Sequence, residues 1–103
     1  MELINKGLME KFIKYPLYSQ EDKGVESEVV VKYFNPCGTG TWLITEAEQQ
    51  EDGDWLMFGY CHICCWEWGY VLLSELQNLR LPFGLTIERD LHVKEGATVR
   101  ELI

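Results

Sequence analysis

Two apolar-rich segments on either side of an Asp-Gly turn constrain the fold of this chain most strongly. "TWLITEAE", residues 41–48, and "WLMFGYCHI", residues 55–63, are rich in β-branched and aromatic residues, and "EDGD", residues 51–54, separates them. An Asp-Gly pair between such segments is a strong short-range signal for a β-hairpin. A further segment of the same kind, "WEWGYVLL" at 66–73, follows after a short break. These segments predict three consecutive antiparallel strands.

The preceding and following segments add one strand and two helices. "SEVVVKYFNP", residues 27–36, has the composition of another strand. Residues 3–13 carry apolar side chains at three- and four-residue spacings, which predicts an amphipathic helix that ends before Pro16. In "SELQNL", Ser74 and Gln77 have capping-box spacing and predict a short helix.

The C-terminal part is less regular. Pro82 and Gly84 mark a turn, residues 85–89 are compatible with a brief extended segment, and Thr98 with Glu101 predicts a last helical turn. We therefore expect an α+β fold with an N-terminal helix, an antiparallel four-stranded meander sheet, a short helix and an irregular C-terminal tail. At this length residues 1–103 should form a single domain.

The sequence lacks a membrane-spanning segment and a signal peptide, and both absences bear on the expected location of the protein. It has no run of about 18 apolar residues, and "MELINKGLMEKF" has neither the charged start nor the apolar centre of a signal peptide. We therefore expect a cytosolic protein that does not insert into a membrane. Thiol buffers keep cysteines reduced in that compartment, so its four cysteines are expected to be free thiols.

The acidic charge is concentrated in the middle of the chain. No Lys or Arg occurs between Lys32 and Arg80, and the 47 residues in that interval carry seven acidic side chains. The remaining 56 residues carry ten acids and nine bases, so nearly all of the formal net charge of -8 comes from one region. Such a region repels nucleic acid and attracts basic partners.

The stretch "CHICCWEWGY", residues 61–70, is the main candidate for metal or redox chemistry. Cys61 and Cys64 form a single CxxC pair, whereas structural zinc needs four ligands, usually from two such pairs. Cys37, Cys65 and His92 lack paired spacing, and in a strand Cys61 and Cys64 would point to opposite faces. A turn at 62–65 would remove that last objection. The pattern favours small buried cysteines over a metal site.

Catalytic patterns are weak. "GTGT", residues 38–41, leads into another strand, whereas a phosphate-binding loop leads into a helix N-terminus. The two histidines, His62 and His92, are thirty residues apart and accompany no recognisable nucleophile pattern. We therefore expect a protein that is not an enzyme and that needs no cofactor.

The acidic hairpin is the strongest candidate for a binding site. "EAEQQEDGD", residues 46–54, contains five carboxylates in nine residues. They are Glu46, Glu48, Glu51, Asp52 and Asp54. One interpretation is that they contact a basic partner; the other is that they form a solvated hairpin tip that keeps the protein soluble.

The aromatic residues give a second hint. In 55–63, Trp55 and Met57 share one face while Phe58 and Tyr60 share the other, and in 66–73 the aromatic residues align at every second position. Both faces of the middle strand are thus apolar, although the chain has few helices to cover them. Either the sheet curls around its core, or an aromatic patch remains for a partner.

Three blocks carry a resemblance to a known family. "FNPCGTGTWLITEAEQQEDGDWLMFGY", "EWGYVLLSELQNL" and "LPFGLTIERDLHV" resemble, in order and spacing, domain-of-unknown-function family 2958, whose members occur in phages, plasmids and integrated mobile elements. The resemblance extends from about Leu3 to Val93. Residues between the "FGY" and "EWGY" blocks vary in that family, which implies that Cys61 and Cys64 do not serve a family-wide metal site.

Within this family the chain is similar to small type II-A anti-CRISPR proteins. The resemblance implies a partner in the cytoplasm of a bacterial host cell, namely the RNA-guided nuclease of type II CRISPR or its guide-RNA complex. Such nucleases hold guide and target in basic channels, where a compact polyanion can compete. That mechanism is an inference from charge, and it predicts inhibition by non-catalytic binding without direct nucleic-acid binding, with a monomer favoured.

Other interpretations remain open at this point. Inhibition could be indirect, without a stable complex. The chain could instead be a zinc-stabilised interaction module centred on Cys61 and Cys64, or an accessory protein of mobile-element DNA processing.

Overall fold

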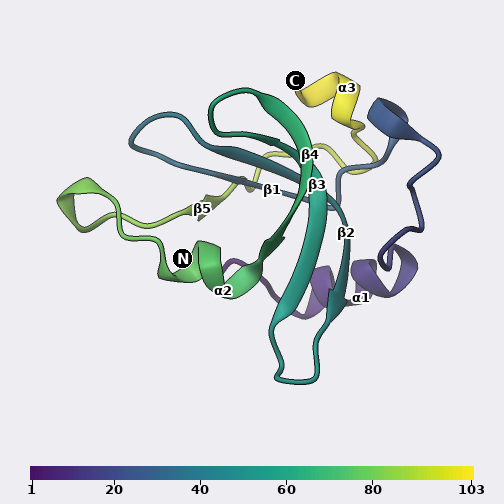
Figure 1. The fold of residues 1–103 in the computed structure, drawn as a ribbon, viewed down its shortest axis with the longest axis horizontal. Helices are drawn as coiled ribbons and strands as arrows, with labels where there is room; N and C mark the ends of the chain where they lie inside the picture. The colour runs from purple at the N-terminus through teal and green to yellow at the C-terminus, as the bar shows by residue number, and fades with distance from the viewer.

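An antiparallel sheet built on the expected hairpin dominates the computed structural model, which describes residues 1–103 (Figure 1). The hairpin consists of β2 (Thr41–Gln49) and β3 (Trp55–His62). β4 (Trp66–Leu72) pairs with β3, and β1 (Val31–Phe34) pairs with β2. All of these pairs are antiparallel, which confirms the predicted α+β class and the predicted meander.

The sheet has five strands, so the predicted number of four is wrong. β5 (Glu88–Arg89) pairs with β1, and the strand order is β4-β3-β2-β1-β5. Two residues cannot show a period-2 pattern, which explains why residues 85–89 predicted no more than a brief extended segment. The irregular tail is thereby tied to the far edge of the sheet.

The helices are short, and their ends follow local capping. α1 (Lys6–Lys14) begins later than predicted, because the Asn5 side chain accepts a hydrogen bond from the Leu8 N–H at 2.9 Å. α2 (Leu73–Asn78) is capped differently from the prediction, since the Glu75 carboxylate accepts from the Leu72 N–H at 2.8 Å. The expected last turn is present as α3 (Val99–Leu102), where Glu101 accepts from the Thr98 N–H at 3.1 Å.

One face of the sheet, here called the core face, is closed by α1 and α2 (Figure 1). The Phe12 ring of α1 lies 5.7 Å from the Trp55 ring between centroids, and Leu76 of α2 joins the same cluster. Other buried members come from three strands. They are Val31, Tyr33, Trp42, Ile44, Met57 and Cys61. This cluster is the main hydrophobic core.

The opposite face, here called the outer face, is covered only in part. Val29, Leu43 and Val99 form a second small cluster there, against which Tyr60 and Trp66 pack. α3 and the 3-10 turn at Gly24–Glu26 cover this end of the face, and an ion pair between Arg100 and Glu26 joins the two elements. The rest of the outer face has no helix over it.

A β-bulge controls which side chains reach each face. The β2–β3 register shifts between Ile44 and Glu46, so that Ile44 lies opposite Gly59 while Glu46 lies opposite Phe58. Gly59 is packed closely under β2: a Cβ atom there would overlap the Leu43 carbonyl oxygen and lie 2.8 Å from the Ile44 Cα. Only a residue without a side chain fits at this position.

None of the helices has the length and apolar character needed to cross a membrane.

Candidate functional site

The hairpin tip holds only part of the expected acidic cluster. Its turn is closed by hydrogen bonds from the Gln50 N–H to the Asp54 carbonyl at 2.7 Å and from the Asp54 N–H to the Asp52 side chain at 3.0 Å. Glu48, Glu51 and Asp52 are exposed. These three carboxylates are available to a partner, although that of Asp52 also shapes the turn.

Glu46 is buried, so its predicted role as a surface contact is wrong. Its side chain is 2 % exposed and accepts hydrogen bonds from the Tyr18 N–H at 2.7 Å and the Gln20 N–H at 2.8 Å. The bulge turns Glu46 toward the outer face, where the loop after α1 folds over it. Glu46 therefore fixes this loop.

The Asp54 carboxylate is also hydrogen-bonded to other groups of the chain. Its carboxylate accepts hydrogen bonds from the Ser74 hydroxyl, from the Ser74 N–H at 3.1 Å and from the Trp55 N–H at 2.8 Å. The Ser74 hydroxyl has the largest effect and lowers the pKa of Asp54, because these bonds favour the ionised form. Asp54 links the hairpin tip to α2 and is not a free contact residue.

The outer face carries a continuous stack of five aromatic side chains. These residues, here called the aromatic ladder, are Phe58, Tyr60, Trp66, Trp68 and Tyr70. Directly opposed rings lie 4.9 Å apart for Phe58 and Tyr70 and 4.8 Å apart for Tyr60 and Trp68. On the diagonal, Phe58 and Trp68 stack with 5.6 Å between centroids and 10° between planes. Cross-strand aromatic pairs of this kind stabilise a sheet and hold the rings in a fixed orientation.

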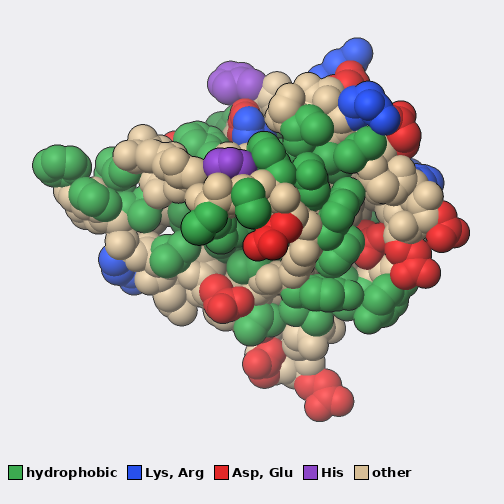
Figure 2. Space-filling model, turned by 45° about the horizontal axis from the view of Figure 1, so that its top comes forward, with side chains coloured by type: hydrophobic (Ala, Val, Ile, Leu, Met, Phe, Trp, Pro, Cys, Tyr) green, Lys and Arg blue, Asp and Glu red, His purple; other side chains and the backbone are tan.

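Exposure increases along the aromatic ladder. Tyr60 and Trp66 pack against the small cluster near α3, whereas Trp68 is 38 % and Tyr70 is 52 % exposed. On the face shown in Figure 2, hydrophobic side chains gather over the sheet, and acidic side chains lie both among them and at their margin. The aromatic ladder is thus covered at one end and open at the other.

Tyr18 extends the open end, and sequence reasoning missed it. Its side chain is 62 % exposed, and its hydroxyl is close enough to that of Tyr70 to raise the pKa of Tyr70. The backbone has φ 73°, a left-handed conformation that is unfavourable for a bulky residue. The Glu46 carboxylate holds this conformation through the Tyr18 N–H. No local pattern in the sequence signals such a contact.

A small cavity adjoins the open end of the aromatic ladder. Its volume is about 260 Å³, and its lining includes Phe58, Trp68, Glu21 and Glu46. The pKa of Tyr70 is raised here: the neighbouring Tyr18 hydroxyl has the largest effect, followed by desolvation, and the carboxylates of Glu46 and Glu21 add to it. Aromatic surface and negative charge therefore lie side by side here.

The cysteines do not come together. Cys61 is buried in the core face, and burial raises the pKa of its thiol to about 11. Cys37, Cys64 and Cys65 are exposed, the last two in the turn between β3 and β4. No group of three or more His, Cys, Asp or Glu side chains has an arrangement that could hold a metal ion.

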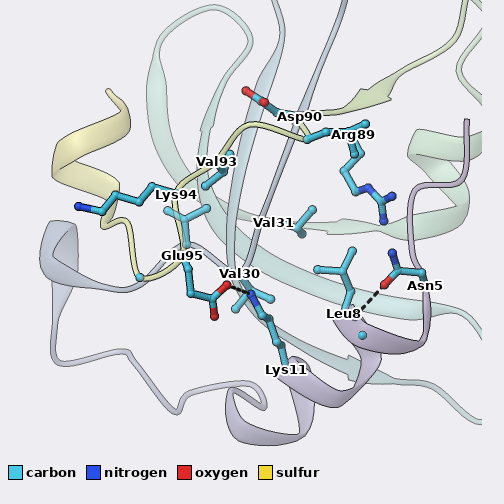
Figure 3. Close-up of a pocket in the computed structure, with 14 residues that line it drawn as sticks. Asn5, Leu8, Lys11, Val30, Val31, Arg89, Asp90, Val93, Lys94 and Glu95 are labelled. Atoms are coloured by element: carbon cyan, nitrogen blue, oxygen red, sulfur yellow. Dashed lines mark hydrogen bonds and ion pairs between the residues drawn. The ribbon is translucent and has the colours of Figure 1, made fainter.

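A second hollow lies between α1 and the tail, with a volume of about 340 Å³ (Figure 3). The Lys11 ammonium of α1 pairs with the Glu95 carboxylate at 2.7 Å across it, and the Arg89 guanidinium points toward the first turn of α1. Val30 and Val31 form its floor. The lining contains no cysteine, serine or histidine nucleophile, and the ion pair fastens the tail to the helix.

The chain matches the model of a family described as "protein of unknown function (DUF2958)" over residues 3–102, and it belongs to this family. The resemblance noted in the sequence is thereby confirmed at the level of the family. No curated protein and no solved structure matches the chain.

Proposed function

We propose that this protein is an anti-CRISPR inhibitor that binds a type II-A RNA-guided nuclease, or its guide-RNA complex, without catalysis. The observation that carries the proposal is the exposed acidic surface of a region without a single Lys or Arg between residues 33 and 79. Such nucleases bind guide and target in positively charged channels, which attract a compact acidic protein. The resemblance to anti-CRISPR proteins of mobile elements supports the choice of partner.

The contact is assigned to Glu48 and Glu51 first. Both are exposed, and neither carboxylate accepts a hydrogen bond within the chain. Asp52 contributes charge at the same tip but also shapes the turn through the Asp54 N–H. Glu46 and Asp54, in contrast, support the surface from within.

A target-DNA cleavage assay with a purified type II-A nuclease tests the proposal. The wild-type protein is expected to reduce cleavage, with guide loading and DNA binding measured separately to identify the step. The double variant Glu48→Gln/Glu51→Gln should need about three to ten times more protein for the same inhibition, as two exposed charge contacts are lost. Added salt should weaken wild-type inhibition in the same direction.

The matched control is Glu2→Gln/Glu10→Gln, which removes the same charge from exposed positions near α1. It should inhibit like the wild type. Unchanged cleavage over a wide excess of wild-type protein would refute direct inhibition. Equal potency of the two double variants would refute the hairpin tip as the contact.

A further inference from the structure

We infer that the open end of the aromatic ladder is a docking site for an arginine side chain on a basic segment of a protein partner. The site consists of Trp68, Tyr70 and Tyr18 with the adjoining cavity of about 260 Å³. The inference rests on the proposed function only in the choice of a basic nuclease as the natural partner. The binding chemistry itself comes from this surface.

The aromatic rings provide the first part of the argument. The face of an indole ring carries negative quadrupole charge and attracts a cation placed over it, and a planar guanidinium also stacks on it. Trp68 is held against Phe58 with 10° between the ring planes, and 38 % of the residue remains exposed. Its orientation is therefore fixed before any partner arrives, which lowers the entropic cost of binding.

The carboxylates provide the second part. Glu21 and Glu46 line the cavity beside Phe58 and Trp68. Both oxygens of Glu46 accept backbone N–H groups, and its carboxylate forms no ion pair with any Lys or Arg. A guanidinium over Trp68 would thus have both an aromatic face and carboxylate charge close to it.

None of the residues that line the cavity is a Lys or an Arg. Strands β2, β3 and β4 contain no Lys or Arg, and Arg100 of α3 is paired with Glu26. The cation must therefore come from a partner. The cavity is smaller than the roughly 300–1,000 Å³ typical of small-molecule sites, which fits one side chain better than a whole ligand.

Charge also selects among possible partners. Single-stranded nucleic acid stacks on exposed aromatic rings as well, but it does so in positively charged grooves. Here the surroundings are negative, so phosphates are repelled. A second copy of this chain carries the same net charge of -8 and is repelled for the same reason.

The position of β4 allows an extended segment to approach. β4 is the outermost strand of the sheet, and apart from Leu72, whose N–H donates to Glu75, its backbone groups make no bonds beyond the β3–β4 pairing. An extended segment running along this edge can pair with the free backbone groups and place alternate side chains over the outer face. Trp68 and Tyr70 are the rings on that face nearest to the edge.

Titration with two peptides of equal charge tests the inference. Hexa-arginine should bind about three to ten times more tightly than hexa-lysine, because guanidinium stacks on indole and ammonium does so less well. In NMR spectra the indole N–H signal of Trp68 should move during the titration, and more than that of Trp66, which packs against the covered end of the aromatic ladder. Those of Trp42 and Trp55, which are 6 % and 8 % exposed in the core, should not.

Two variants at one position separate stacking from folding. Trp68→Leu should lose the preference for hexa-arginine, while Trp68→Phe should keep part of it, and circular dichroism should show both to be folded. The double variant Glu48→Gln/Glu51→Gln removes charge at the hairpin tip and leaves the residues of the cavity unchanged. It should keep the preference for hexa-arginine, although its overall affinity for both peptides falls with the net charge.

Four outcomes would overturn the inference. They are equal affinity for the two peptides, an unmoved Trp68 signal, the same indole shifts with a short oligo-dT strand, and concentration-dependent shifts without any peptide. Failure of the wild-type protein to inhibit the nuclease, with arginine-selective binding intact, would refute the proposed function alone.

Discussion

The two faces of the same sheet differ in how they are covered. On β3, Met57 and Trp55 lie under α1 and α2 and are fully or nearly buried, whereas Phe58 and Tyr60 point to the outer face and are half-buried. Both sets are equally apolar in the sequence. The difference arises because α1 and α2 cover the core face, while α3, with four residues, covers only one end of the outer face.

This difference separates stability from binding. A side chain under two helices makes apolar contacts on all sides and contributes strongly to folding. A ring in the aromatic ladder contacts its neighbours on the sheet but leaves part of its surface to solvent. We therefore expect substitutions on the core face to affect unfolding, and those at the open end of the aromatic ladder to affect binding.

The largest effect is expected from Met57→Ala on the core face. Met57 is 0 % exposed, and its truncation leaves a cavity that costs about 2–5 kcal/mol in the free energy of unfolding. Urea denaturation monitored by circular dichroism measures this. Tyr70→Ala on the outer face is the matched test and should cost less than about 1 kcal/mol. Similar losses for both variants would mean that the two faces do not differ as described.

Glu46→Ala should have the next largest effect. It removes the acceptor of two backbone N–H groups and leaves them without a partner, at a cost of about 2 kcal/mol after the loop relaxes toward water. Glu48→Ala, two residues along β2 and exposed, should stay within about 0.5 kcal/mol. Faster amide hydrogen exchange at Tyr18 and Gln20 in Glu46→Ala alone would locate the change. Equal stabilities would show that the carboxylate does not hold the loop.

The sequence predicted three of the strands well because their signals are local, whereas the strand expected over 27–36 is limited to Val31–Phe34. The segments 41–48, 55–63 and 66–73 each correspond to an observed strand to within one residue at either end, since alternation and the Asp-Gly turn act over a few residues. β5 has only two residues and exists because β1 offers it a partner. Its sequence therefore carries little information about it.

The candidate site was only partly predictable. Glu48, Glu51 and Asp52 are at the surface, as expected for a hairpin tip. Glu46 is not, because the bulge at Ile44–Glu46 and the distant loop at Tyr18 decide its surroundings. A bulge adds one residue to a strand without a necessary sequence signal, so the face of each later side chain could not be read from alternation alone.

Ser74→Ala should have a smaller effect that depends on pH. The Ser74 hydroxyl lowers the pKa of Asp54 below its ordinary value of 3.8, so the ionised carboxylate stabilises the fold at neutral pH. The stabilisation is fully present above the unfolded-state pKa and is lost as pH falls through the lower folded-state pKa. At pH 7 the variant should lose about 1 kcal/mol, and the difference from wild type should shrink between pH 5 and pH 2.

Thermal unfolding across that pH range measures the difference, with Gln77→Ala on the exposed side of α2 as the control. A difference that stays constant with pH would mean that the ionised form of Asp54 is not what Ser74 stabilises.

The smallest effect on stability is expected from Trp68→Leu at the open end of the aromatic ladder. Leu keeps apolar contact with Phe58, and more than a third of the Trp68 surface is already exposed, so the cost should be below about 1 kcal/mol. Urea denaturation alongside Met57→Ala gives the comparison directly. A loss as large as that of Met57→Ala would assign the aromatic ladder to the core.

The close packing at Gly59 restricts which substitutions this fold accepts. Gly59 belongs to the "FGY" block, and any side chain there would overlap the Leu43 carbonyl. This requirement comes from the path of two backbones and is independent of what the surface binds. A descendant could exchange every carboxylate of the tip and every ring of the aromatic ladder and would still need glycine at this point. Glycine at position 59 is therefore a requirement of the scaffold and carries no information about what the surface binds.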